Sequence, residues 1–181
     1  AKLGIEQDWR GYIDYASGDP IQYVPFHQVL RWIDAQDTAR LSSVFAGKPV
    51  LIVNTASKCG FTPQYDDLQR LHVELGPQGL VVLGFPSNDF SQEPDSNQKI
   101  ADFCENTFGV KFPMMAKTSV RGPQAAPLFQ QLAQKTDTTP KWNFYKYVIS
   151  RDGKEIKAFS SMTGPTDRTF LVEIERMLQQ P

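Results

Sequence analysis

From residue 50 onward, apolar residues occur either in continuous runs or at helical spacing. The run VLIVNT at 50–55 is rich in β-branched residues and follows a turn sequence at 46–49, which is typical of a strand covered on both faces. The run LVVLGF at 80–85 predicts a second buried strand. Between them, apolar residues recur at three- and four-residue steps and predict a helix: Tyr65, Leu68, Leu71 and Leu75. Strand, helix and strand in this order form the crossover unit of a parallel sheet.

The remaining pattern completes an α/β domain. Apolar faces predict helices over 97–108 and 126–135, and the extended segment 111–120 between them is predicted to be a strand. Two alternating strands around an Asp-Gly turn predict a hairpin over 144–160. A last helix has its apolar residues on one face: Phe170, Leu171, Ile174, Met177 and Leu178. The order β-α-β-α-β-α-β-β-α is that of the thioredoxin-like fold, with a mixed central sheet flanked by helices.

The composition is that of an ordinary soluble domain. The 181 residues are 40% hydrophobic and 22% charged, with a formal net charge of -1. That balance gives no electrostatic reason to expect nucleic acid or an anionic membrane surface as a partner. The apolar runs are too short to span a bilayer. No metal-ligand cluster or glycine-rich phosphate loop stands out, so we expect neither a metal nor a cofactor.

We expect one thioredoxin-like domain over 46–181. Residues 1–45 mix aromatic and turn residues and are expected to form an atypical N-terminal extension that packs on this domain. The chain begins at Ala1 without an initiator methionine, which is compatible with a mature or trimmed product. The expected compartment stays open between the bacterial periplasm or exterior and the cytoplasm.

Cys59, one of only two cysteines, lies between the first predicted strand and the helix that follows. A thiol at the start of a helix faces free backbone N–H groups and the positive end of the helix dipole. Both favour the thiolate, which is the nucleophilic form. Thr62 occupies the place of the second cysteine in a C-x-x-C motif, so dithiol exchange of that type is not expected. An unreactive buried thiol is the alternative.

Four blocks in order resemble the glutathione peroxidase family: VLIVNTASKCGFTPQY, VVLGFPSNDFSQEPDSN, FCENTFGVKFPMMAKTSVRG and KWNFYKYVISRDGKEIKAFSS. The resemblance extends from about Lys48 to the C-terminus. It implies that Cys59 is a peroxidatic thiolate that attacks the O–O bond of hydrogen peroxide or an organic hydroperoxide and becomes a sulfenic acid. It also implies that Trp142 and Asn143 donate N–H hydrogen bonds to the thiolate or the departing oxygen. Taken in isolation, the same pair would be a core aromatic and a turn residue.

The block FPSNDF departs from the family pattern. Asp89 stands where the family has glutamine, and the segment before QEP is one residue short. An ionised carboxylate close to a thiol disfavours the thiolate. Asp89 is therefore expected to be protonated or turned away, or else Asn88 or Gln92 supplies the amide donor. The block resembles a bacterial variant of the family. Two alternatives stay open: a general thiol–disulfide oxidoreductase, and a binding or scaffold module whose catalysis has been lost.

Cys104 lies on the apolar face of the predicted helix 97–108, where a core thiol is the simplest interpretation. The family resemblance implies instead a resolving cysteine that condenses with the sulfenic acid of Cys59 to form an intramolecular disulfide. Such a reaction requires local unfolding around 100–109. The resulting disulfide suits thioredoxin or a similar dithiol as reductant, with glutathione possible. The short segment TDTTP at 136–140 replaces an insertion of the tetrameric members, which implies a monomer with an open site.

Overall fold

The computed structural model describes residues 47–180, so the expected extension at 1–45 lies outside the described residues. Within this range no helix is long and apolar enough to cross a membrane. The elements, in chain order, are β1 (Val50–Thr55), α4 (Gln64–Leu75), the 3-10 turn η1 (Gly76–Gln78), β2 (Val81–Pro86), α5 (Asn97–Phe108), α6 (Pro127–Thr136), β3 (Lys146–Ile149), β4 (Ile156–Phe159) and α7 (Arg168–Gln179).

The strands form one mixed sheet in the order β2-β1-β3-β4. β1 and β2 run parallel, with Val50 opposite Val81, whereas β3 runs antiparallel to β1, with Val50 opposite Ile149. β3 and β4 form the predicted antiparallel hairpin. The expectation of an α/β fold with a mixed sheet flanked by helices is confirmed.

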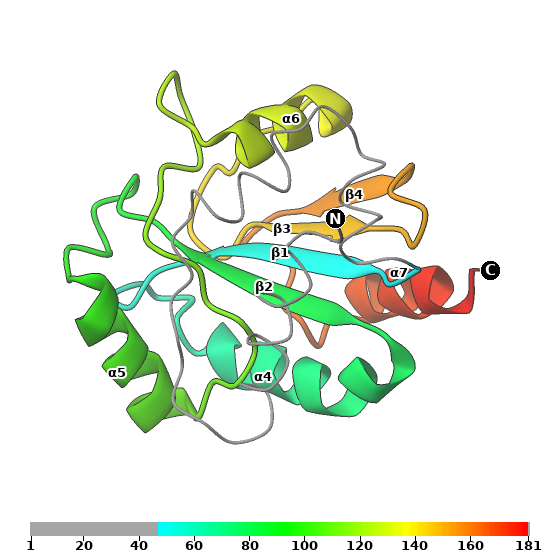
Figure 1. Ribbon diagram of the computed structural model, residues 1–181, viewed down its shortest axis with the longest axis horizontal. Helices are drawn as coiled ribbons and strands as arrows, with labels where there is room; N and C mark the ends of the chain where they lie inside the picture. Colours follow the sequence, from blue (N-terminus) through cyan, green and yellow to red (C-terminus); the bar gives the residue numbers. More distant parts are fainter. Residues whose placement is uncertain (1–46, 181) are drawn as a thin grey trace, which may run out of the picture.

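Each face of the sheet is covered by helices. Figure 1 shows α6 on one face and α4, α5 and α7 on the other. Along β1, Val50 and Ile52 belong to the cluster on the α6 face, whereas Leu51 and Val53 belong to the opposite cluster. A strand buried on both faces has a continuous apolar sequence, because alternate side chains enter different cores. This is why the run at 50–55 does not alternate.

The segment 111–120, predicted to be the third strand, forms only one parallel bridge, between Met114 and Gly84. The Gly84 N–H donates to Pro113 O, and the Met115 N–H donates to Gly84 O. The next hydrogen bonds of a parallel ladder would need N–H donors at Pro113 on one side and at Pro86 on the other. Proline has no N–H, so the ladder stops after one residue pair. The prediction of a full strand here was wrong.

The strand directions bring three loops to one edge of the sheet. β1 and β2 are parallel, so the loops that follow Thr55 and Pro86 leave from the same edge. β3 is antiparallel to β1, so the residues that precede Lys146 arrive at this edge as well. These loops contain Cys59, Asp89 and the pair Trp142–Asn143. The fold alone therefore gathers most of the expected site.

The close approach of the 111–115 segment to β2 predicts that Gly84→Ala destabilises the domain. A Cβ at Gly84 would lie 2.3 Å from Met114 Sδ and 3.1 Å from a ring carbon of Phe112, both buried. Overpacking of this kind costs about 1–3 kcal/mol, and urea unfolding measures it. Gly164→Ala is the matched control, because its nearest neighbours would lie at 3.9 Å, an ordinary contact. Equal stability of the two variants would contradict the interpretation.

Candidate functional site

Cys59 lies in a series of turns between β1 and α4 and is half-buried. The Phe61 N–H donates to Cys59 Sγ at 3.4 Å. The Cys59 N–H donates to Thr62 Oγ1 at 3.0 Å, and this hydroxyl donates to Ala56 O at 2.9 Å. Thr62, at the position of a second C-x-x-C cysteine, therefore fixes the backbone on either side of the thiol. A backbone N–H is thus directed at the sulfur.

The helix expected to begin at Cys59 begins only at Gln64. The residues between them form successive turns, in which the Thr62 N–H donates to Cys59 O and the Gln64 N–H donates to Phe61 O. Lys58 precedes the thiol in the sequence, but it directs its amine to Asp95 Oδ2 at 2.9 Å. The contact to the sulfur in this loop comes from the Phe61 N–H, whereas the neighbouring lysine pairs with Asp95 and the helix begins only at Gln64.

Two consecutive residues after β2, Gln92 and Glu93, hold the cysteine loop in place. The Gln92 carbonyl accepts a hydrogen bond from the Lys58 N–H at 3.1 Å. Glu93 Oε2 accepts hydrogen bonds from the Ser57 N–H at 2.7 Å and the Ser57 hydroxyl at 2.8 Å. The Glu93 side chain is fully buried, and burial raises the pKa of its carboxyl despite these hydrogen bonds. The two loops thus form one connected unit.

Asn143 joins this unit from the third loop. Its side-chain amide donates to Gln92 Oε1 at 2.7 Å, and the whole residue is buried. Trp142 beside it remains 41% exposed, and its ring contacts Phe90 with a centroid distance of 5.2 Å. Gln92 therefore connects the cysteine loop, through its carbonyl, to Asn143, through its side chain. A partly exposed indole thus lies next to this connection.

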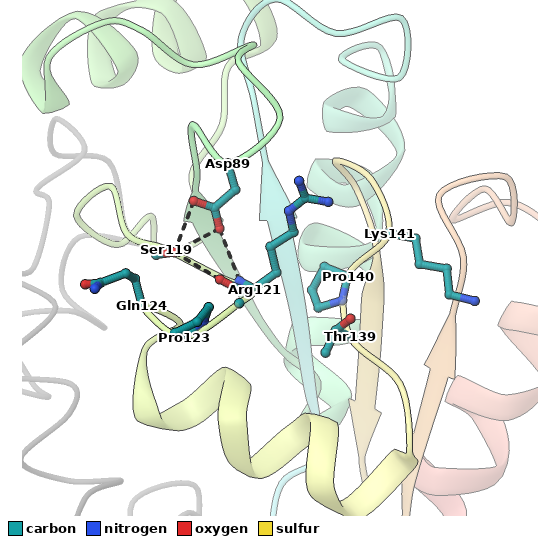
Figure 2. Close-up of a pocket in the computed structure, with 9 residues that line it drawn as sticks. Asp89, Ser119, Arg121, Pro123, Gln124, Thr139, Pro140 and Lys141 are labelled. Carbon is teal, nitrogen blue, oxygen red and sulfur yellow. Dashed lines mark hydrogen bonds between the residues drawn. The ribbon is translucent and has the colours of Figure 1, made fainter.

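Asp89 is turned toward a different segment. Its carboxylate accepts hydrogen bonds from the Ser119 hydroxyl, at 3.0 Å and 3.1 Å, and from the backbone N–H groups of Val120, at 2.6 Å, and Arg121, at 3.1 Å. Figure 2 shows the carboxylate directed at this loop. The structure thus uses Asp89 as a loop-fixing residue. Of the two amide candidates, Gln92 contacts the cysteine loop through its backbone carbonyl and Asn143 through its side chain.

Cys104 is fully buried in the interior of α5. It belongs to the apolar cluster on the α4 face of the sheet, and Cys59 packs at the border of the same cluster. The Cys104 thiol neighbours Tyr65; burial first, and then this thiol, holds the pKa of the Tyr65 hydroxyl well above its usual range. Both sulfurs therefore adjoin one core, but Cys104 is enclosed by an intact helix.

Lys146 is a fully buried amine in β3. It donates to Phe144 O at 2.7 Å and to Thr163 O at 2.8 Å. Burial lowers its pKa to about 7, and the opposing effect of Asp167 is smaller. A neutral amine has two N–H groups, which matches the two carbonyls. Lys146 thus joins the turn that contains Asn143 to the loop before α7.

Sequence reasoning missed three residues that position the site: Asn54, Glu93 and Lys146. Each had a signal in the sequence. Asn54 interrupts the apolar run of β1, and Glu93 lies within one of the quoted family blocks. In the alternating strand, Lys146 falls on the same face as Phe144 and Val148, which both enter the core. A polar residue at a core position indicates a partner that the pattern does not reveal.

Comparison with protein families gives a match to the family model described as glutathione peroxidase, over residues 29–133. The match begins upstream of Lys48. A hydroperoxy fatty acid reductase of Synechocystis is 43% identical over 74% of this chain and 85% of its own length. A glutathione peroxidase-like peroxiredoxin of Chlamydomonas reinhardtii is 47% identical over 73% of this chain and 83% of its own length.

Solved structures give the same result at the level of the fold. The apo crystal structure of Trgpx has a TM-score of 0.61 and 38% identity, covering 77% of this chain and 86% of its own. A thioredoxin-family thiol:disulfide interchange protein from Chlorobium tepidum has a TM-score of 0.55 at 15% identity, covering 76% and 84%. The second likeness shows the fold alone. The thioredoxin-like fold predicted from the sequence is confirmed.

The buried amine of Lys146 predicts a specific dependence of stability on pH. Its pKa is about 7 in the folded protein and close to the ordinary lysine value of 10.5 in the unfolded chain. Between these values the unfolded chain binds more protons, so the free energy of unfolding rises with pH. We expect the stability of the wild type relative to Lys146→Met to increase from about pH 7 to about pH 10, measured by urea unfolding. Lys154→Met, at a side chain that is 85% exposed, is the control. A difference between wild type and Lys146→Met that does not vary with pH would contradict this assignment.

Proposed function

The chain belongs to the glutathione peroxidase family, and we propose that it is a thiol peroxidase in which Cys59 reduces hydrogen peroxide and organic hydroperoxides. The observation that carries the proposal is the junction of three loops at Gln92, which links the loop of Cys59 to Asn143 beside an exposed Trp142. A half-buried sulfur that accepts a backbone N–H gives this junction its nucleophile.

In the proposed reaction the Cys59 thiolate attacks one oxygen of the peroxide. The S–O bond forms as the O–O bond breaks, so sulfur is oxidised to a sulfenic acid and the peroxide is reduced. The departing oxygen carries the negative charge and takes a proton to leave as water or an alcohol. N–H donors directed at that oxygen stabilise the transition state. We assign this role to the indole of Trp142 and the amide of Asn143.

We further assign the third amide to Gln92. Asp89 occupies the sequence position where the family has glutamine, but its carboxylate is committed to the 119–121 loop. Gln92 lies on the shortened segment before Glu93 and bonds both the Lys58 N–H and Asn143. In this proposal, Gln92 on the shortened segment supplies the amide that position 89 lacks. The one-residue deletion and the loss of glutamine at 89 are thus linked. Asp89 then acts on catalysis through the loop that it holds.

The second half of the proposed cycle uses Cys104. Its thiol attacks the sulfenic sulfur of Cys59, which forms the disulfide and releases water. The two thiols adjoin the same core, yet Cys104 is fully buried within α5. The disulfide therefore requires α5 to unwind around residues 100–109. Gly109, in the left-handed conformation that ends the helix, marks one boundary of the segment that opens.

For the reductant we propose thioredoxin or a similar dithiol, with glutathione as the competing reductant. An intramolecular disulfide is reduced efficiently by a dithiol, and relatives of this chain carry the name glutathione peroxidase-like peroxiredoxin. We also propose a monomer, because α6 is followed by only a short connection, 137–141, before Trp142. The alternative function is a binding module of the same fold without peroxidase activity.

The first test is oxidation of the reduced protein by one equivalent of hydrogen peroxide, followed by stopped flow. We expect Cys59 to react orders of magnitude faster than free cysteine, and peptide mass mapping to find a Cys59–Cys104 disulfide. Hydrogen exchange is expected to show loss of protection over 100–109 in the oxidised form, because α5 has opened. Cys59→Ser abolishes the reaction, whereas Cys104→Ser retains the fast step and accumulates sulfenic acid.

The controls separate the parts of the proposal. A rate no faster than that of free cysteine would favour the binding module. Fast oxidation without the linkage would remove Cys104 from the cycle and leave the peroxidase assignment intact. NADPH consumption with thioredoxin and thioredoxin reductase, compared with glutathione and its reductase, identifies the reductant. The thioredoxin system is expected to sustain the faster turnover.

The second test compares Gln92→Ala with Asp89→Asn. Loss of a transition-state hydrogen-bond donor costs roughly 10²–10³ in rate, so Gln92→Ala is expected to slow Cys59 oxidation by at least about 10-fold. Asp89→Asn keeps an acceptor for the 119–121 loop and is expected to change this rate by less than about 3-fold, because a neutral hydrogen bond in an exposed loop contributes little. The reverse order of effects would place Asp89, and not Gln92, beside the reacting sulfur.

A further inference from the structure

Tyr65 is the side chain at which the helix after the cysteine loop meets the helix of the second thiol. It lies in the first turn of α4, shortly after Cys59, and is fully buried. Its ring contacts Phe108 at the end of α5, with a centroid distance of 5.4 Å. It also contacts the ring of Phe144, in the turn before β3, edge-on at 5.2 Å. Figure 1 shows α4 and α5 on the same face of the sheet. Tyr65 thus adjoins both halves of the proposed site.

The hydroxyl of Tyr65 has polar neighbours but no aligned hydrogen-bond partner. Burial raises its pKa most, the neighbouring Cys104 thiol raises it further, and the neighbouring Thr55 hydroxyl lowers it. Yet neither the Tyr65 oxygen nor Thr55 Oγ1 forms a hydrogen bond with any described residue, although both atoms are buried. A buried polar atom without a partner costs free energy and calls for an explanation. Two such hydroxyls lie beside the thiol that has to leave the core.

Opening of α5 changes what surrounds the Tyr65 hydroxyl. In the closed helix it lies beside the Cys104 thiol, in the core shared by α4 and α5. When residues 100–109 unwind, Cys104 departs and water reaches the hydroxyl, which then both donates and accepts hydrogen bonds. Burial of a hydroxyl without a partner is costly, so its hydration favours the open state. The hydroxyl thus offsets part of the cost of exposing the apolar side chains around it.

We propose that Tyr65, together with Thr55, is a positioning residue for the second step of the cycle, and that its buried hydroxyl promotes the release of Cys104 from α5. In that step the Cys104 sulfur attacks the sulfenic sulfur of Cys59. The S–S bond forms as the S–O bond breaks, and the thiol proton leaves with the hydroxide as water. Tyr65 takes no part in this exchange of bonds and acts through the position of Cys104. The inference rests on the proposed peroxidase function and adds to it a residue that sets the rate of disulfide formation.

The test measures the two steps separately in reduced full-length Tyr65→Phe, with one equivalent of hydrogen peroxide and no reductant. The variant keeps the ring and its contacts with Phe108 and Phe144, so we expect little change in the stopped-flow rate of Cys59 oxidation. Disulfide formation, followed by peptide mapping of quenched samples, is expected to slow by about ten-fold, the effect of about 1.4 kcal/mol from one buried hydroxyl. Thr55→Val keeps the β-branched shape and is expected to slow the same step. Both variants are expected to be more stable in urea, whereas a merely structural role would make them less stable.

Tyr147→Phe is the matched control, because it removes a buried hydroxyl from the α6 face that donates to Thr138 O at 3.0 Å. It is expected to lower stability and to leave the rate of disulfide formation unchanged. Hydrogen exchange of the reduced protein reports the opening of α5 without peroxide, and protection over 100–109 is expected to rise about ten-fold in Tyr65→Phe.

Disulfide formation that is equally fast or faster in Tyr65→Phe would overturn the proposal, as would unchanged or lower protection of α5. An equal slowing in Tyr147→Phe would also overturn it, since the effect would then not depend on the neighbourhood of Cys104. If the wild type forms no disulfide, the proposed function fails at Cys104, and this role of Tyr65 fails with it. Normal disulfide formation in the wild type with no effect of Tyr65→Phe contradicts only the role of Tyr65.

Discussion

The amide side chain of Asn54 joins the two segments on which the site depends. It donates to the carbonyl of Trp142, 88 positions away, at 3.1 Å and accepts the Tyr145 N–H at 3.0 Å. The Asn54 backbone accepts the Phe144 N–H as well, and Phe144 adopts a φ of 61°, a conformation that costs a non-glycine residue about 1–3 kcal/mol. Asn54 itself is fully buried. Its hydrogen bonds compensate this strain and fix where Trp142 and Asn143 stand relative to β1.

Hydrogen bonds between loops assemble the rest of the proposed site on this frame. Gln92 and Glu93 connect the loop after β2 to the loop of Cys59. The Lys146 amine donates a hydrogen bond to the Phe144 carbonyl in the turn before β3. Buried polar groups of this kind are costly unless they are hydrogen-bonded, so each bond also defines a single arrangement of the loops. Polar contacts thus fix the loop that carries the sulfur, and Cys59 also packs against the border of the apolar cluster on the α4 face.

The periodic part of the sequence predicted the fold well. Helices α4, α5, α6 and α7 and the hairpin of β3 and β4 follow from spacing alone, because each buries one apolar face. The segment 111–120 was misread because its extended sequence hides the effect of Pro113 and Pro86 on the ladder. Strand pairing depends on two segments at once, whereas hydrophobic periodicity describes one segment at a time.

The sequence indicated the residues of the proposed site but not the contacts between them. The placement of Cys59 between a strand and a helix indicated a reactive thiol, and the quoted blocks indicated Trp142 and Asn143. The sequence left Asp89 with several possible orientations, because nothing local reveals that the backbone of residues 120–121 competes for its carboxylate. It likewise could not show that Gln92 meets Asn143, a contact made across 51 positions. Side-chain partners distant in sequence follow from the fold, and not from the spacing around each residue.

The burial of Cys104 sets a time scale for the proposed cycle. Opening α5 exposes apolar side chains of the core, among them Ile100, so the open state is rare and the second thiol arrives only as often as the helix opens. In the interval the sulfenic acid is exposed to a second molecule of peroxide, which converts it to a sulfinic acid that no thiol reduces. In the proposed cycle, the packing of α5 would therefore govern the peroxide concentration at which the protein is inactivated. Mutations in the α5 core, far from the reacting oxygen atoms, would alter tolerance to oxidant without altering the rate of the first step.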